Sequence, residues 1–484
     1  MIGALLMGGA AMTSAQTPPP ADPTPQQAAT EQKTDVPAST TSPERRACAV
    51  CPPRRPGHAL LQTTGINVMY ELANLIRGQV TARITPASWW DNMENGWVWD
   101  LDDFTVNQVG HPYQGSNYFN AGRANGLSFY ESAAVTAFGS ATWEYFGETN
   151  KPSLNDFINT TLGGIALGEM FHRAAWLIRD PHKTGKARLW SEIGATVVDP
   201  ITGLNRFVSG DASQVSDKPP DMIPASLRGF TSAGVLWRGS QSNAFSSTGQ
   251  PFLETQVFYG NIERGRSRTP YETFAVRLRF GGGSAFSEAY VRGRLLGEPL
   301  GHGLQFNVRQ TYDYQSNDAY ATGSQSFEAV LGSRWQVSRA LNLTAMGWGG
   351  LTVLGAVDSL PLGVTERPPE EEEPSGGQGV SEGPRFYDYG PGSDFGAFAH
   401  LDYNGRSLLV FEYTGHQLFS LDGVRANHVL QRMRTDVLVP VHGRVGIGTS
   451  LEFFRRKSYY QDPQKTRQSY HYPQIRAYLT WSQQ

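Results

Sequence analysis

Apolar and polar side chains alternate residue by residue through most of the second half of the chain. In residues 304–314, Leu304, Phe306, Val308, Tyr312 and Tyr314 fall on one side of a strand, and Gln305, Asn307, Arg309, Thr311 and Asp313 fall on the other. This follows because neighbouring side chains of a strand point to opposite faces. A closed barrel in a bilayer needs an apolar outer face and a polar interior. The pattern therefore predicts an antiparallel transmembrane β-barrel.

The same alternation recurs to the C-terminus and predicts about 12 strands, an even number as in bacterial single-chain barrels. Most expected strands have about ten or more residues, which suits a tilted membrane span. A long external loop is expected over residues 355–384, and we interpret its acidic run, 370–373, as solvated rather than as a cation site. The expected strands are 226–238, 252–263, 271–282, 286–296, 302–314, 320–336, 340–354, 386–403, 406–419, 425–438, 443–457 and 470–482.

Helical periodicity precedes these strands. A short amphipathic helix is expected over residues 65–79, followed by two longer helices over 120–146 and 153–178. A capping box opens the last of these, with Ser153 accepting from the helix start and Asp156 reaching back. The Trp-rich stretch 88–104 is expected to form a loop or short strand near a membrane interface.

Glycines 163, 164 and 168 leave a bare strip on the last expected helix. Another backbone can approach closely along such a strip because glycine has no side chain. The short turn between the two long helices favours antiparallel packing of the pair. The fold class is therefore α+β, an N-terminal helical domain followed by the barrel.

Composition divides the 484-residue chain into five parts. Residues 1–15 resemble a signal peptide, although the usual positive charges are absent, and 16–56 are expected to be a disordered periplasmic linker. A helical domain is expected over 57–180, an irregular connector over 181–224 and the barrel over 225–484. The net charge of -3 argues against nucleic-acid binding.

The chain has two cysteines, Cys48 and Cys51, and both lie in the expected linker. A thioredoxin-like site would need a following helix, and a four-ligand zinc site would need a second pair of ligands. We therefore expect a disulfide between them without a catalytic role. No metal or other cofactor is predicted.

Polar residues lie inside the otherwise apolar expected helices, where charged groups need partners. Ser140, Glu144 and Glu148 share one helical face by their spacing of four, and Glu169 can pair with Arg173 one turn later. If the helices pack antiparallel, the polar faces of the two helices can meet, and together with His111 they can form a buried polar network. The predicted network contains Asn107, His111, Arg123, Ser140, Glu144, Glu148, Asp156, Glu169 and Arg173.

Several of these residues lie in short sequence segments that together form a characteristic pattern. Its pieces are 103–119 (DFTVNQVGHPYQGSNYF), 121–126 (AGRANG), 139–145 (GSATWEY), 152–156 (PSLND), Gly163-Gly164 and Gly168-Glu169. Together they resemble the bacterial domain-of-unknown-function 3943 family. The resemblance implies an envelope protein of Gram-negative bacteria and supplies no catalytic residues.

Two functions remain open at this point. The first is noncatalytic, an outer-membrane barrel with a helical plug in the lumen or a periplasmic helical domain, acting in envelope integrity or solute passage. Its partners would be outer-membrane lipids and, during insertion, the barrel-assembly machinery. The alternative is a hydrolase of lipid or peptidoglycan with Ser140 as nucleophile, His111 as base and Glu144 as orienter. The sequence favours the first, because no G-x-S-x-G or H-E-x-x-H motif is present.

Overall fold

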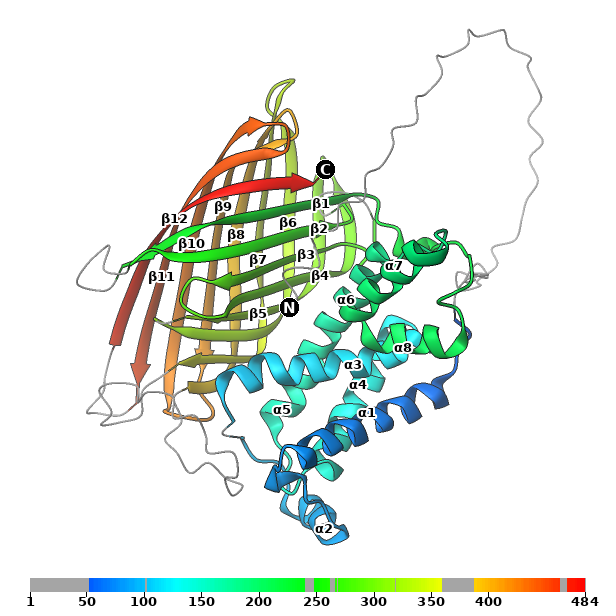
Figure 1. Cartoon of the computed structure of the whole chain (residues 1–484). Coiled ribbons are helices and arrows are strands. Elements are labelled where there is room, and N and C mark those ends of the chain that lie inside the picture. The colour runs from blue at the N-terminus through cyan, green and yellow to red at the C-terminus, as the bar shows by residue number, and fades with distance from the viewer. Residues whose placement is uncertain are drawn as a thin grey trace, which may run out of the picture. The chain divides into compact units, whose positions relative to one another are not determined.

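The strands form one closed antiparallel barrel in the computed structural model (Figure 1). The structure describes residues 52–100, 102–239, 248–261, 266–267, 269–317, 319–358, 387–461 and 468–483. The ring closes because β1 pairs with both β2 and β12. The strands are β1 Leu227–Arg238, β2 Gln250–Tyr259, β3 Phe274–Gly281, β4 Phe286–Gly301, β5 Leu304–Ser316, β6 Ala321–Gln336, β7 Leu341–Asp358, β8 Tyr387–Tyr403, β9 Arg406–Phe419, β10 Ala426–His442, β11 Val445–Tyr460 and β12 Gln468–Gln483.

The predicted fold class and strand number are confirmed, and the strand ends differ from the expected ones by a few residues. Four connections at one end of the barrel are short, and they lie at 302–303, 337–340, 404–405 and 443–444. β1 begins and β12 finishes at this same end, which we call the short-turn end. The expected signal peptide, most of the linker, Cys48 and Cys51 lie outside the described residues, as does most of the loop 355–384.

The helices correct several sequence-based boundaries. They are α1 Pro56–Ile76, α2 Pro86–Asn95, α3 His111–Ala124, α4 Phe129–Phe146, α5 Leu154–Ile158, α6 Gly164–Ile178, α7 Gly185–Val198 and α8 Pro200–Ser209. The first helix begins nine residues before the expected start at Gly65. The Trp-rich stretch begins as helix α2, because Thr85 and Ser88 form a capping box there.

The helix expected over 120–146 is two helices. Gly126 has a φ of +74°, a left-handed conformation that glycine adopts readily and that interrupts a helix. Ser128 then caps α4 in a reciprocal box with Glu131. The connector expected to be irregular, 181–224, instead contains α7 and α8, so it is helical over most of 185–209. Among the described helices, none has both the length and the apolar character needed to cross a membrane.

The predicted glycine strip is confirmed at the crossing of α3 and α6. A Cβ atom built on Gly164 would lie 2.5 Å from the backbone carbon of Gly115, and one on Gly115 would lie 1.8 Å from the Thr160 carbonyl oxygen. Real Cβ atoms do not approach backbone so closely, so larger side chains would separate these helices. The strip thereby fixes the relative position of the polar residues on α3 and α6.

The helices contact the outer side of the barrel wall. Tyr312 of β5 donates a hydrogen bond to the Gln108 carbonyl at 2.5 Å, and the Gln108 amide donates to the Tyr389 hydroxyl at 3.1 Å. Each tyrosine is next to an aspartate in its strand, Tyr312 to Asp313 and Tyr389 to Asp388. The Asp388 side chain points inward, because it bonds to His428 of β10 inside the barrel. The tyrosines therefore point outward. These contacts place the segment before α3 against the outer face of the wall, which disagrees with a helical plug in the lumen. The other alternative, a periplasmic helical domain, stays a prediction.

Candidate functional site

Buried polar residues gather in two places, one between the helices and one inside the barrel. We call the first the helical carboxylate group, defined as Glu144, Glu148 and Asp156 with His111. His111 opens α3, and its Nδ1 lies 3.2 Å from Thr160 Oγ1. Its Nε2 lies 3.6 Å from Asp156 Oδ1, and both side chains are less than a tenth exposed. α3 and the segment around α5 thus bring together two residues that are 45 positions apart in sequence.

Glu144, in α4, and Glu148, in the turn after it, accept hydrogen bonds from different donors. Glu144 Oε2 accepts from the backbone N–H of Ser153 at 2.7 Å, and Glu148 Oε1 accepts from the indole N–H of Trp143 at 2.9 Å. Ser153 Oγ accepts from the Asp156 N–H at 3.3 Å, as the expected cap requires. The Ser153 N–H, which the sequence assigned to Asp156, donates to Glu144 instead.

The carboxylates of this group repel one another in a poorly solvated space. Burial raises the pKa of Glu144 well above its ordinary value, and the negative charges of Asp156 and Glu148 raise it further. Burial likewise raises the pKa of Glu148 to about 7, although His111 opposes this shift. Protons are therefore held here at a pH at which exposed glutamates are ionised.

The alternative enzymatic constellation does not assemble into a nucleophile–base pair. The Ser140 hydroxyl donates to the Phe157 carbonyl at 3.3 Å, whereas the hydrogen-bonding partner of the His111 ring is Thr160. Glu144 faces Ser153 rather than His111. Hydrogen-bond reach between nucleophile, base and orienter is the geometric requirement for such catalysis, and the described contacts do not provide it.

The remaining predicted polar residues link the helices to each other and to the barrel. Glu169 of α6 lies between two arginines, 3.0 Å from Arg123 Nε and 2.8 Å from Arg173 Nε. Arg173 also donates to the Pro270 carbonyl at 3.2 Å, next to β3. Asn107 donates to the Tyr387 hydroxyl of β8 at 2.9 Å. These contacts hold the side chains in position. They also join Arg173 and Asn107, two members of the predicted network, to the outer wall of the barrel.

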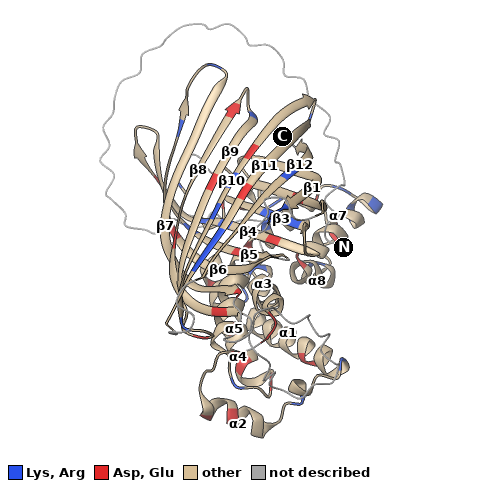
Figure 2. Cartoon of the chain, turned by 90° about the vertical axis from the view of Figure 1, so that its left-hand side faces the viewer, with Lys and Arg blue, Asp and Glu red and all other residues tan. Residues whose placement is uncertain are grey.

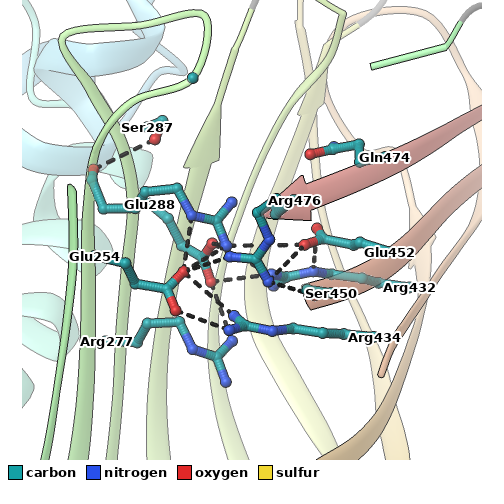
Figure 3. Close-up of polar contacts among 12 residues, drawn as sticks. Glu254, Arg277, Ser287, Glu288, Arg432, Arg434, Ser450, Glu452, Gln474 and Arg476 are labelled. Carbon is teal, nitrogen blue, oxygen red and sulfur yellow. Dashed lines mark hydrogen bonds and ion pairs between the residues drawn. The ribbon is translucent and has the colours of Figure 1, made fainter. Parts of the chain in front are cut away.

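The second buried group crosses the barrel interior, and we call it the lumen ion network (Figure 3). Figure 2 shows basic and acidic positions, in blue and red, along the strands of the barrel. Its members are Glu254, Arg279, Glu288, Arg432, Arg434, Asp436, Glu452 and Arg476. Glu254 of β2 lies 2.7 Å from Arg279, 2.8 Å from Arg434 and 2.8 Å from Arg476. All four side chains are at most 4% exposed.

The network spans the full width of the lumen. Glu288 of β4 lies 3.1 Å from Arg432 of β10, and these strands are six positions apart in either direction around the ring of 12. Arg432 in turn lies 2.8 Å from Glu452 of β11. Figure 3 shows the side chains reaching toward one another from opposite walls. The middle of the lumen is therefore filled by paired charges.

A cavity of about 130 Å³ lies between this network and the short-turn end. Its lining combines charged groups, among them Arg228, Arg277 and Glu412, with aromatic rings such as Phe258 and Phe398. Clefts that combine a few polar groups with aromatic walls are the usual shape of small-molecule sites.

One further group inside the barrel has the donor atoms of a metal site. Carboxylate oxygens of Asp313 and Asp394 and a ring nitrogen of His416 all lie within 4.8 Å of one another. His416 Nδ1 is 3.1 Å from Asp394 Oδ2, a distance at which a protonated ring forms an ion pair with the carboxylate without any metal. The nearby Arg292 and Arg309 already pair with Glu412 and Glu328.

Alternation with apolar neighbours assigns Arg277, Arg279, Arg432 and Arg434 to the inward face, but it does not identify their partners. Among the acidic partners, only Glu452 has apolar neighbours on both sides, whereas Thr255 follows Glu254 and Ser287 precedes Glu288. Pairing across a closed ring depends on strand register and barrel shear, which local patterns do not contain.

Comparison with known proteins agrees with the division into a helical segment and a barrel. Residues 96–201 match the family described as a domain of unknown function (DUF3943), which confirms the resemblance over that segment. The matched residues include His111, Glu144, Glu148 and Asp156. No curated protein matches the chain.

Three solved structures illustrate the similarity of the barrel. A NanC porin is 9% identical over 51% of this chain and 98% of its own, with a TM-score of 0.24. The Pseudomonas putida toluene transporter TodX is 8% identical over 54% and 90%, with a TM-score of 0.21. The Acinetobacter baumannii outer membrane channel DcaP is 10% identical over 53% and 96%, with a TM-score of 0.21.

Proposed function

We propose that this protein is an outer-membrane β-barrel of a Gram-negative bacterium, with a noncatalytic role in solute passage through a lumen that is closed at rest. The outward side chains of the strands support the membrane assignment. Leu351 is 70% exposed, Leu479 60% and Val439 58%, whereas the residues that alternate with them are polar or face the lumen. Water would penalise such a surface, and lipid would not.

The single observation that carries the closed state is the contact between Glu288 and Arg432 on opposite walls. A solute crossing the middle of the lumen has to separate such pairs, which leaves charges without partners in a poorly solvated space. Breaking a buried pair by removing one member costs about 3–5 kcal/mol. Passage is therefore infrequent until a ligand or another protein contact offsets this cost.

The lining of the cavity at the short-turn end indicates which class of solute the barrel accepts. Arginine and glutamate side chains line it together with aromatic rings. This lining suits a small solute with both a charged group and an apolar part. In bacterial outer-membrane barrels, short turns face the periplasm and longer loops face outward. By that rule, the cavity lies on the periplasmic side of the lumen ion network.

Liposome swelling tests the proposal. Wild-type protein in phospholipid liposomes should admit amino acids and monosaccharides slowly. E288A/R432A should admit them several-fold faster, because both long side chains are removed together and no charge is left unpaired. R266A/E298A is the matched control, because this ion pair lies on a surface where Arg266 is 63% exposed. Fast swelling of the wild type, unchanged in E288A/R432A, would contradict a closed lumen.

A further inference from the structure

Helices α7 and α8 have their polar side chains inside and their apolar side chains outside. The exposed apolar residues include Leu189, Trp190, Ile193 and Val197 of α7 and Leu204, Phe207 and Val208 of α8. Trp190 is 69% exposed and Val208 is 81% exposed. On α7 these residues follow the spacing i, i+1, i+4 and i+8, so they form one continuous stripe.

The opposite side of the same helices is occupied by charges. Glu192 lies 2.9 Å from Arg179, 2.8 Å from Arg188 and 3.0 Å from Arg206. The Glu192 side chain is 1% exposed and that of Arg179 is fully buried. A helix pair at a protein–water surface has the reverse arrangement, with its apolar face in the core. Inverted polarity is instead the arrangement of the barrel wall.

Exposed apolar residues continue from this hairpin to the barrel. Val215 is 62% exposed, Ile223 59% and Leu227 43%, and Leu227 is the first residue of β1 at the short-turn end. Lys183 and Lys186 are exposed beside the start of α7, close in sequence to Trp190. Lysine next to tryptophan and aliphatic residues is the composition of helices that lie in the interface of an anionic bilayer.

We infer that the α7–α8 hairpin lies on the phospholipid leaflet at the short-turn end of the barrel. Its apolar stripe enters the boundary between headgroups and acyl chains, and Lys183 and Lys186 contact anionic headgroups. This docking fixes the depth and tilt of the helical segment beside the barrel. The inference rests on the proposed membrane insertion of the barrel.

Spin-label accessibility in the full-length protein tests this docking. Cys48 and Cys51 are replaced by serine, and single labels are introduced as Leu189→Cys, Val197→Cys and Val208→Cys. The protein is reconstituted into nanodiscs of phosphatidylethanolamine and phosphatidylglycerol. Collisions with oxygen, which concentrates in lipid, are compared with collisions with a water-soluble nickel chelate. Leu351→Cys on the outer face of β7 serves as the lipid-facing reference, and Lys186→Cys serves as the matched polar position on α7.

The inference predicts that the three hairpin labels behave like the label at Leu351, with oxygen collisions several-fold favoured over nickel collisions, while the label at Lys186 favours nickel. Hairpin labels that favour nickel while Leu351 favours oxygen would overturn the docking and leave the membrane barrel intact. Protection from both reagents together with dipolar broadening would assign the stripe to a second copy and would also overturn it. A label at Leu351 that favours nickel would refute the membrane barrel itself.

Discussion

The two buried charged groups differ in how their charges are compensated. In the lumen ion network each carboxylate meets arginines, and Glu254 alone lies within 2.8 Å of three of them. In the helical carboxylate group, the charges of Asp156 and Glu148 raise the pKa of Glu144, and the one basic member is His111, which lies 3.6 Å from Asp156. The first group is held by attraction between opposite charges, whereas the second relieves repulsion by holding protons.

This difference teaches that burial alone does not decide what a charged cluster does. Paired charges resist separation, so the lumen network suits a barrier. A carboxylate whose pKa is about 7 changes its charge near neutral pH, so the helical group responds to acidity. Loss of a charged partner should therefore destabilise the lumen ion network, whereas a change of pH should destabilise the helical carboxylate group.

The largest expected effect is the loss of one lumen carboxylate. Glu254→Gln leaves three arginines without their shared partner, and we expect it to lower the free energy of unfolding by about 3–5 kcal/mol. The measurement is the shift of the unfolding midpoint in detergent, followed by the mobility difference between folded and unfolded barrel on gels. Glu298→Gln is the control, because its ion pair with Arg266 lies at the surface. Equal shifts for both variants would mean that the lumen network adds nothing beyond a surface pair.

The next effect is a pH dependence confined to the helices. Folding raises the pKa of Glu148 from 4.5 to about 7, so the folded state binds more protons than the unfolded state between these values. Stability is therefore fully present at low pH and is lost as the pH rises through about 7, by an amount on the order of 2 kcal/mol. The thermal midpoint of the helical circular-dichroism signal should be lower at pH 8 than at pH 5.

Glu148→Gln sharpens the same comparison. Glutamine can replace the protonated acid without titrating, so the variant should lose the part of the pH difference that Glu148 contributes, while Glu144, whose pKa burial also raises, keeps its own part. Glu131→Gln is the control, because Glu131 caps α4 beside Arg54 and these contacts lower its pKa to about 2. A Glu148→Gln variant with the full wild-type pH dependence would show that another group titrates.

A smaller effect concerns the attachment of the helices to the outer wall. Tyr387→Phe removes the hydroxyl that accepts from Asn107 and donates to the Asp102 carbonyl, and it leaves the aromatic ring in place. We expect a loss of about 1 kcal/mol, measured as faster proteolysis of the helical segment under native conditions. The control, Tyr403→Phe, alters a tyrosine that is 50% exposed at the end of β8. No difference between the variants would argue against a stable contact between Asn107 and the barrel.

The smallest effect separates the positioning role of Ser140 from a catalytic one. Ser140→Ala removes one hydrogen bond to the Phe157 carbonyl, which should cost about 0.5–1.5 kcal/mol and leave solute passage unchanged. Release of fatty acid from phospholipid should be absent in the wild type and in the variant alike. Fatty-acid release that depends on Ser140 would restore the hydrolase alternative.

The barrel was largely predictable because its signal is local. Alternation in residues 304–314 assigns Arg309 and Asp313 to the interior, and their contacts confirm the assignment. The same alternation also places Tyr312 and Tyr314 outside, but it does not show that helices rather than lipid cover them. The hydroxyl groups of these tyrosines indicate polar partners on the outer face, and Tyr312 does donate to the Gln108 carbonyl.

The helical segment was less predictable because its residues are polar where they are buried. Asn107, Ser140 and Asp156 interrupt the apolar spacing on which helix prediction depends, and Gly126 ends a helix in the middle of an expected one. α7 and α8 were missed for a related reason. Their stripe of apolar residues faces outward, so it resembled an irregular surface segment in the sequence.

Single-channel recording in planar phospholipid bilayers tests the closed lumen most directly. The wild type should insert without a steady open level, and E288A/R432A should show a stable conductance because the contact between β4 and β10 is gone. A large, steady conductance in the wild type that is the same in the double variant would contradict the account.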